Sequence, residues 1–114
     1  MFAHRVTMSL KTDSHKQLSR RIDQSIMLLL KQQKGFIDGT TLVSPERSIA
    51  IEDTYWKTKD DAEAYQRIGY LKVQKMLSEF VKTMPKDSIF EVPVSNIYQI
   101  GMDRPYLRAS TMKQ

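Results

Sequence analysis

The order in which two kinds of hydrophobic periodicity follow one another is the feature that most restricts how this chain can fold. Residues 2–10 alternate apolar and polar side chains, and residues 48–56 do so again. A period of two over nine residues is typical of a half-buried strand. Residues 14–34 and 59–84 instead repeat apolar side chains every three or four positions, which predicts amphipathic helices. Each predicted helix therefore follows a predicted strand.

Two further strands complete the pattern. Residues 36–43 are rich in β-forming side chains and a proline-containing turn joins them to residues 48–56, which predicts an antiparallel hairpin. Residues 88–100 predict the last strand, and Pro93 within it requires an edge position or a bulge. The order β-α-β-β-α-β predicts a ferredoxin-like α+β fold, with two helices on one face of a four-stranded antiparallel sheet.

Residue types at the ends of the predicted helices support these boundaries. Ser14 and Thr58 are expected N-caps, and each is followed three residues later by a side chain that can complete a capping box. Gly35 is an expected left-handed stop for the first helix, and Pro85 ends the second.

Both faces of the predicted sheet carry apolar side chains, although the helices can cover only one of them. We expect residues 1–100 to form a single domain and residues 101–114 to be an irregular tail. The apolar side chains are Val6, Met8 and Trp56 on one face and Ile49, Ile51 and Tyr55 on the other. A second apolar face requires a partner. We therefore predict a homodimer, joined through its sheets into a dimeric α+β barrel.

The composition argues against several classes of function. The chain has no cysteine and two histidines, His4 and His15, so neither a thiolate nucleophile nor a zinc cluster is expected. It lacks a glycine-rich phosphate loop, and its net charge of +5 is spread along the chain, so we expect no cofactor and no nucleic-acid partner. The apolar run at residues 26–30 is far shorter than the roughly 20 residues that span a bilayer. We expect no membrane partner and a cytoplasmic location.

Residues 35–65 place a Gly-Phe pair after the first helix, then a hairpin, and then a strand that ends on Trp-Lys-Thr before an acidic helix start. This arrangement resembles the antibiotic-biosynthesis-monooxygenase-like (ABM-like) domains of the dimeric α+β-barrel superfamily. The matching residues are Gly35, Phe36, Gly39, Trp56, Thr58, Asp60 and Asp61. The resemblance extends over residues 2–100 and implies the fold more strongly than any activity. Such domains include cofactor-free oxygenases, haem-degrading enzymes, isomerases and proteins of no known activity.

The resemblance to particular enzymes of this group is partial. Quinone-forming members have an Asn four residues before the Trp and a Tyr six residues after it. Here these positions are Glu52 and Ala62, although Tyr65 lies one turn further along. Haem-degrading members use positions that correspond to His4, Tyr65 and Lys75. Because no histidine lies on the second predicted helix, the haem ligand is missing and a haem enzyme is not expected.

The strand-like residues 48–56 bring several chemically active side chains onto one face. Glu52, Thr54 and Trp56 alternate there, and antiparallel pairing with the first strand would place His4 beside Thr54. We predict His4 and Glu52 as catalytic residues, with His4 the general base toward a phenol or enol and Glu52 orienting the ring or raising its pKa.

A set of aromatic and hydroxyl side chains is predicted to bind the substrate: Trp56, Thr54, Tyr65 and Tyr70. The tyrosines could donate hydrogen bonds to a developing oxyanion. In the alternative interpretation Trp56 only fills the core, His4 is exposed near the N-terminus, and Glu52 pairs with Arg5 or Arg47 at the surface.

The predicted function is that of a cofactor-independent monooxygenase-like protein acting on a small aromatic or polyketide-type substrate. A substrate that forms a carbanion can react with oxygen itself, so the protein need only remove a proton and stabilise the anion. The alternative is a non-catalytic dimeric barrel that binds a small apolar or aromatic ligand or serves in stress. A pocket filled by Trp56, Phe80 and methionine side chains would favour this alternative.

Overall fold

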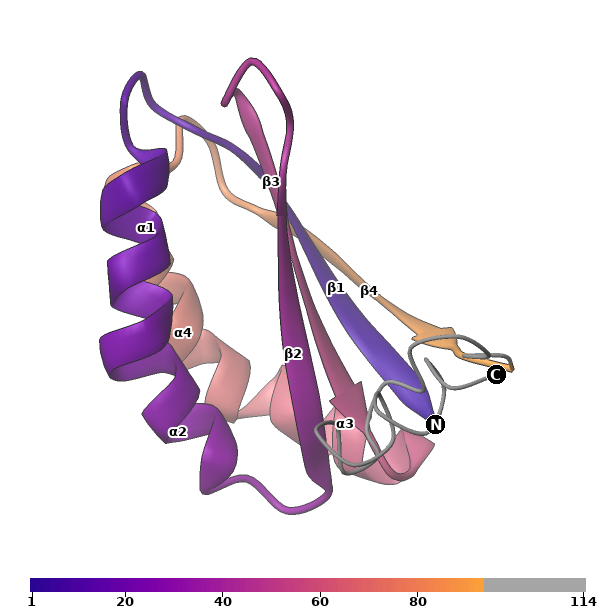
Figure 1. The fold of residues 1–114 in the computed structure, drawn as a ribbon. Coiled ribbons are helices and arrows are strands. Elements are labelled where there is room, and N and C mark those ends of the chain that lie inside the picture. The colour runs from indigo at the N-terminus through magenta and orange to yellow at the C-terminus, as the bar shows by residue number, and fades with distance from the viewer. Residues whose placement is uncertain (94–114) are drawn as a thin grey trace, which may run out of the picture.

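The computed structural model describes residues 1–93, which form one antiparallel sheet with every helix on the same side of it (Figure 1). The strands are β1 (Phe2–Ser9), β2 (Phe36–Val43), β3 (Ile49–Trp56) and β4 (Lys86–Glu91), in the spatial order β2-β3-β1-β4. β1 pairs with both β3 and β4, so the first strand lies inside the sheet. The ferredoxin-like α+β fold predicted from the two periodicities is confirmed.

Two helical segments cover the sheet. The first consists of α1 (His15–Arg21), a π-helical turn η1 (Ile22–Ile26) and α2 (Met27–Lys31), and the second of α3 (Lys59–Arg67), α4 (Gly69–Leu77) and a 3-10 turn η2 (Ser78–Phe80). Among the described residues, none of these helices has the length and apolar character needed to cross a bilayer.

Both helical segments begin where the sequence predicts, but the first ends at Lys31 and not at residue 34. The hydroxyl of Thr58 accepts a hydrogen bond from the amide of Asp61 at 3.0 Å, as the capping-box spacing predicts. Gly35 has a positive φ of 79°, and a Cβ there would collide with the Asp61 carboxylate, so this turn requires glycine. Ser14 occupies its N-cap position, but its side chain makes no capping hydrogen bond.

The second helix is shorter and less regular than its periodicity predicts. It breaks at Ile68, whose φ of −121° and ψ of −66° are not helical. The break brings the backbone of Gly69 so close to Tyr65 that a Cβ would lie 2.8 Å from the ring. The helix ends at Phe80 instead of near residue 84, because Val81 is extended and forms a β-bridge with Leu10.

The last strand also differs from its predicted range. It begins at Lys86, because the antiparallel ladder with β1 already includes Lys86 opposite Thr7 and Asp87 opposite Val6. It ends at Glu91, just before Pro93. The rest of the predicted strand and the predicted tail, residues 94–114, lie outside the described residues.

The side chains on the helix-facing side of the sheet form the core. They include Val6, Met8, Ala50 and Trp56, which pack against Leu18, Ile26, Leu30, Val73 and Leu77 from the helices. The opposite side is called here the open face, because within residues 1–93 no helix lies over it (Figure 1).

The open face combines exposed apolar side chains with one ion pair. The exposed fractions of Leu42, Ile49 and Phe90 are 51%, 43% and 52%. Between them, the guanidinium of Arg5 donates two hydrogen bonds to the Asp53 carboxylate, at 2.9 and 2.8 Å. The predicted second apolar face is therefore present and lies on one side of the described domain.

Candidate active site

His4 is fully buried in the layer between the sheet and the helices, with an exposed fraction of 0%. It lies opposite Thr54 of β3, as predicted, and opposite Ile89 of β4. The alternative expectation of an exposed His4 is wrong, because the even-numbered face of β1 is the face that the helices cover. A buried imidazole needs a hydrogen-bonding partner to offset its lost hydration.

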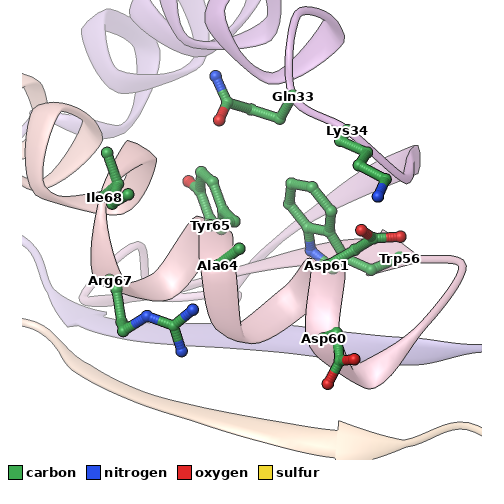
Figure 2. Close-up of a pocket in the computed structure, with 9 residues that line it drawn as sticks. All are labelled: Gln33, Lys34, Trp56, Asp60, Asp61, Ala64, Tyr65, Arg67 and Ile68. Atoms are coloured by element: carbon green, nitrogen blue, oxygen red, sulfur yellow. The ribbon is translucent and has the colours of Figure 1, made fainter.

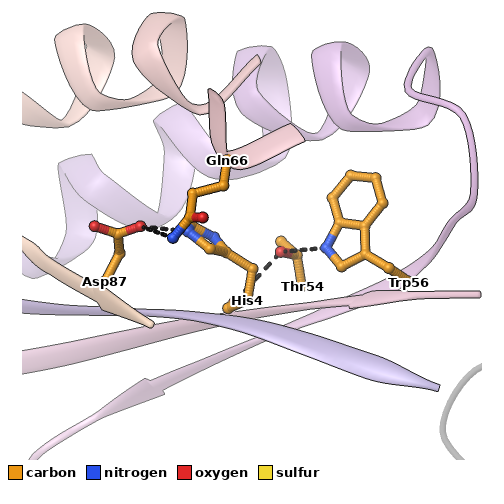
Figure 3. Close-up of polar contacts among 5 residues, drawn as sticks. All are labelled: His4, Thr54, Trp56, Gln66 and Asp87. Carbon is orange, nitrogen blue, oxygen red and sulfur yellow. Dashed lines mark hydrogen bonds and ion pairs between the residues drawn. The ribbon is translucent and has the colours of Figure 1, made fainter. Parts of the chain in front are cut away.

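Asp87 is that partner. Its Oδ2 lies 2.8 Å from Nε2 of His4, and the same oxygen accepts a hydrogen bond of 2.9 Å from the side-chain amide of Gln66 (Figure 3). Partial burial raises the pKa of Asp87, but the hydrogen bonds from Gln66 and His4 outweigh this effect and the net shift is downward. Asp87 is therefore ionised at neutral pH.

The imidazole of His4 is neutral at the same pH. Burial lowers its pKa below the ordinary value of 6.5, and the nearby carboxylates of Asp87 and Asp53 offset this only in part. One ring nitrogen, Nε2, is held by Asp87. The other, Nδ1, is buried and has no hydrogen-bond partner within residues 1–93. A neutral imidazole with one unpartnered nitrogen has the form that a general base requires.

Aromatic rings surround the imidazole. Tyr70 and Tyr65 meet it edge-on, with ring centroids at 4.7 and 5.4 Å, and Tyr65 stacks on Trp56 at 4.7 Å. The indole of Trp56 donates a 3.0 Å hydrogen bond to the Thr54 hydroxyl (Figure 3). Five of the six predicted site residues therefore form one contiguous cluster, listed as His4, Thr54, Trp56, Tyr65 and Tyr70.

The two tyrosines are hydrogen-bond donors at neutral pH. Burial raises the pKa of Tyr70 to about 12 and that of Tyr65 above its ordinary value. The Tyr70 hydroxyl is buried and has no partner within residues 1–93. Such a hydroxyl could donate to an oxyanion that forms beside His4.

Glu52 lies on the same face of the sheet but does not pair with His4. It sits opposite Val6 on one side and Thr41 on the other, and its Oε2 accepts a hydrogen bond from the Thr41 hydroxyl. Its Oε1 is buried without a partner within residues 1–93. Burial raises the pKa of Glu52 to about 7. It is thus a second titratable group of the helix-facing layer, separate from the His4–Asp87 pair.

The two alternative interpretations of Glu52 each name a wrong partner for it. The partner of His4 is Asp87 and not Glu52, and Arg5 pairs with Asp53 instead of Glu52. Asp87 and Gln66 were not predicted as site residues. Alternation along the last strand gives a weak signal for Asp87, but its register against β1 is not available from the sequence.

A cavity of about 400 Å³ adjoins the Trp56–Tyr65 stack and is named here the α2–α3 cavity. In Figure 2, Gln33 and Lys34 lie across it from helix α3, with the two rings between them. Its lining residues are Gln33, Lys34, Trp56, Asp60, Asp61, Ala64, Tyr65, Arg67 and Ile68. Tyr65 lines this cavity and also contacts the imidazole edge-on, so its ring connects the lining of the cavity with His4.

A second, more open cavity of about 590 Å³ lies between α3 and β4 and is named the α3–β4 groove. Gln66 lines it together with Phe2, Lys59, Glu63, Ile89 and Glu91. Among residues 1–93, no group of three or more histidine or acidic side chains is placed to hold a metal ion.

Comparisons with known proteins place this geometry in a structural context. No family model matches the chain, and no curated protein matches it in sequence. Solved structures do match. A monooxygenase from ActVA-Orf6 of Streptomyces coelicolor, in complex with nanaomycin D, aligns over 83% of this chain and 89% of its own, with a TM-score of 0.68 and 15% identity.

Two further solved structures align with this chain to a similar extent. SnoaB, a cofactor-independent oxygenase from Streptomyces nogalater, was solved as a variant and aligns over 82% of this chain and 94% of its own, with a TM-score of 0.65 and 12% identity. A Nitrosomonas europaea protein whose name assigns it to the antibiotic biosynthesis monooxygenases aligns over 82% of this chain and 100% of its own, with a TM-score of 0.65 and 19% identity.

The chain has the ABM-like fold. At these identities the likeness concerns the fold, and the chemistry must be argued from the residues of this chain. Within the ABM-like fold of this protein, the helix-facing layer holds the His4–Asp87–Gln66 hydrogen bonds, the aromatic rings and the buried carboxyl of Glu52.

Proposed function

We propose that this protein is a cofactor-independent monooxygenase-like enzyme that acts on a small aromatic or polyketide-type phenol, with His4 as its general base. The observation that carries the proposal is the state of the His4 ring. Its Nε2 is held by the Asp87 carboxylate and its Nδ1 is unpartnered within residues 1–93, while burial lowers its pKa and so favours the neutral form. This arrangement favours proton abstraction and a positioned imidazolium.

The proposed reaction needs only a base and molecular oxygen. His4 Nδ1 takes the proton of a phenol, and the electron-rich ring carbon of the phenolate then reacts with O₂ to form a peroxide anion at that carbon. The imidazolium returns its proton to this anion, which gives a hydroperoxide and regenerates the base. Loss of water from the peroxide leaves the quinone, so that the phenol loses two hydrogens, gains one oxygen atom, and the other oxygen atom leaves as water. We expect Tyr70 to donate a hydrogen bond to the developing oxyanion.

The predicted substrate contacts are Thr54, Trp56, Tyr65 and Tyr70. The α2–α3 cavity supports this part of the proposal, because the stacked rings of Trp56 and Tyr65 line it and the Tyr65 ring also contacts His4. We propose that a flat phenol enters from this cavity and displaces the Tyr65 ring. Glu52, with a pKa of about 7, stays in the proposal as a second catalytic residue.

A second candidate function is binding without catalysis. The side chains of His4, Trp56, Tyr65 and Tyr70 are all at most 3% exposed, so the rings fill the layer around the base. That closed packing favours a dimeric barrel that binds a small apolar or aromatic ligand, or serves in stress, without chemistry.

We further propose that two copies assemble through their open faces into a dimeric α+β barrel and that the protein is cytoplasmic, without a nucleic-acid or membrane partner. The exposed apolar side chains of Leu42, Ile49 and Phe90 support the assembly. We expect no cofactor.

The test is oxygen uptake with a panel of dihydroxyanthracene-type phenols near pH 7. General bases contribute roughly 10²–10⁴-fold, so His4→Ala should lower kcat by at least about 100-fold. His15→Ala removes the other histidine of the chain, outside the site, and should leave kcat unchanged. Equal rates for His4→Ala and the wild type would remove His4 from the mechanism. A wild type that consumes no oxygen with any phenol would favour the non-catalytic candidate.

A further inference from the structure

Gln66 and His4 donate to the same oxygen of Asp87. The side-chain amide of Gln66 reaches Oδ2 from α3 at 2.9 Å, and Nε2 of His4 reaches it from β1 at 2.8 Å (Figure 3). Neither residue is close to Asp87 in sequence, since 21 and 83 positions separate them from it. The carboxylate is thus held by two donors that come from different elements of the fold.

We propose that Gln66 is a positioning residue that keeps the proton of neutral His4 on Nε2 and so makes Nδ1 the nitrogen that accepts a proton. Gln66 acts through Asp87 and does not touch the imidazole in this role. The inference concerns the state of the ring and holds whether or not the protein is an oxygenase. Its consequence for catalysis rests on the proposed function.

The physical argument begins with the charge of Asp87. An ionised carboxylate can only accept hydrogen bonds, so Nε2 must be the donor to it. The amide of Gln66 stabilises the ionised form, because a hydrogen bond to the charged state favours that state. The same hydrogen bond also keeps Oδ2 turned toward the imidazole, because both donors meet that one oxygen. Without Gln66, the Asp87 side chain, which is 27% exposed, could turn toward solvent. Nε2 would then lose its acceptor, and the neutral imidazole could carry its proton on either nitrogen.

The groups around the imidazole do not offer another way to fix its proton. Asp53 of β3 is already bound by two hydrogen bonds from Arg5. Tyr65 of α3 and Tyr70 of α4 meet the ring edge-on, and no hydrogen bond joins them to it within residues 1–93. Asp87 is therefore the one charged group among the described residues that hydrogen-bonds to His4.

Gln66 and Asp87 lie at a partly exposed side of the helix-facing layer, whereas the Nδ1 atom of His4 lies inside it. Gln66 lines the α3–β4 groove, and the side chain of Asp87 is 27% exposed. The Nδ1 atom of His4, in contrast, is buried in the space that the ring shares with the two tyrosines. Gln66 can thus be changed without opening the aromatic cluster.

The experiment measures the tautomer of His4 directly by ¹⁵N NMR of the imidazole nitrogens at pH 7.5. The chain has two histidines, so His4 is assigned by comparison with His15→Ala. In the wild type we expect a protonated-type shift at Nε2 and an unprotonated-type shift at Nδ1. In Gln66→Met, which keeps the length of the side chain but removes the donor, we expect the two shifts to move toward each other as both tautomers become populated.

Gln74→Met is the matched control, because Gln74 lies on α4 at a different cavity. It should leave both His4 shifts at their wild-type values, and both variants should unfold at temperatures close to that of the wild type. If Gln66→Met is unstable, Gln66→Ala supplies the second measurement: it also removes the donor to Asp87, so the two His4 shifts should again move toward each other.

Wild-type His4 with its proton on Nδ1, or unchanged His4 shifts in Gln66→Met, would overturn the proposal. These outcomes do not depend on oxygen uptake, so failure of this inference is distinct from failure of the proposed function. Where wild-type activity is found, Gln66→Met should lower kcat about tenfold or more and leave KM unchanged, as expected for a residue outside the substrate site.

Discussion

The imidazole of His4 and the carboxylate of Asp87 form a hydrogen bond of 2.8 Å that joins the first strand of the sheet to the last described one. The two side chains lie on the same face of the sheet, diagonal to each other across the β1–β4 ladder. The bond therefore exists only when the chain has folded from one end of the described domain to the other.

Replacing Asp87 by asparagine should lower the pKa of His4 further. The Asp87 carboxylate raises that pKa by its charge and hydrogen bond, whereas an amide keeps the shape but not the charge. Under the proposed function kcat should also fall by at least about tenfold. An NMR titration of His4 measures the first effect. Glu91→Gln, also on β4 but outside this bond, is the control, and a His4 titration unchanged by Asp87→Asn would contradict the prediction.

Glu52 should make the protein less stable as the pH rises toward neutrality. Its pKa is about 7 in the folded protein against an ordinary value of 4.5, so its contribution is fully present below pH 4.5 and is lost as the pH rises through 7. The loss is on the order of 3 kcal/mol in the free energy of unfolding. Glu52→Gln cannot ionise and should be more stable than the wild type at pH 8, as measured by urea denaturation.

The ionisation of His4 changes the free energy of unfolding in the opposite direction with pH, which gives a second check on this prediction. Its folded pKa lies below 6.5, so its contribution is present above that value and is lost on acidification. The stability of Glu52→Gln should therefore increase from pH 5 to pH 7. Glu63→Gln, a carboxyl on α3 outside the Glu52–Thr41 contact, should keep the wild-type pH profile. A Glu52→Gln profile parallel to that of the wild type would show that Glu52 titrates normally.

Trp56 should have separable roles in packing and in binding. It is fully buried, stacked on Tyr65 and hydrogen-bonded to Thr54, so Trp56→Ala should lower the free energy of unfolding by about 3–5 kcal/mol. Trp56→Phe should remain folded but change the affinity for flat phenols, measured by fluorescence or calorimetry. Leu71→Ala, at an exposed position of α4 outside the open face, should cost far less. A small effect of Trp56→Ala would exclude a core role.

The open face should mediate dimer formation. Light scattering at micromolar concentration should report about twice the chain mass of 13.3 kDa. Ile51→Asp and Leu42→Asp place a charge on that face and should yield monomers, because a buried unpaired carboxylate is costly. Leu71→Asp makes the same kind of change at an exposed position of α4 and should stay dimeric. A monomeric wild type, or dimers of both open-face variants, would refute this assembly.

Several features of the protein follow from the sequence by itself. The alternation of β1 and β3 already places His4, Thr54 and Trp56 on one face, and it places Arg5 and Asp53 on the other. The Thr58 cap and the Gly35 turn follow from local residue types. These features depend on residues a few positions apart, so the order of elements and the fold class can be predicted without knowing any distant contact.

Only the tertiary structure decides which carboxylate forms a hydrogen bond with His4. Glu52 and Asp87 both lie on its face of the sheet, and the choice depends on the register of β4 against β1, which no local pattern specifies. The role of Gln66 depends on how α3 packs over that edge. The helix break at Ile68, which brings Gly69 against the Tyr65 ring, is likewise not indicated by the apolar periodicity of that segment. Local periodicity assigns residues to the faces of strands and helices. Which residues meet across the sheet depends instead on packing between segments that are distant in sequence, and this packing determines the hydrogen-bond partners of His4.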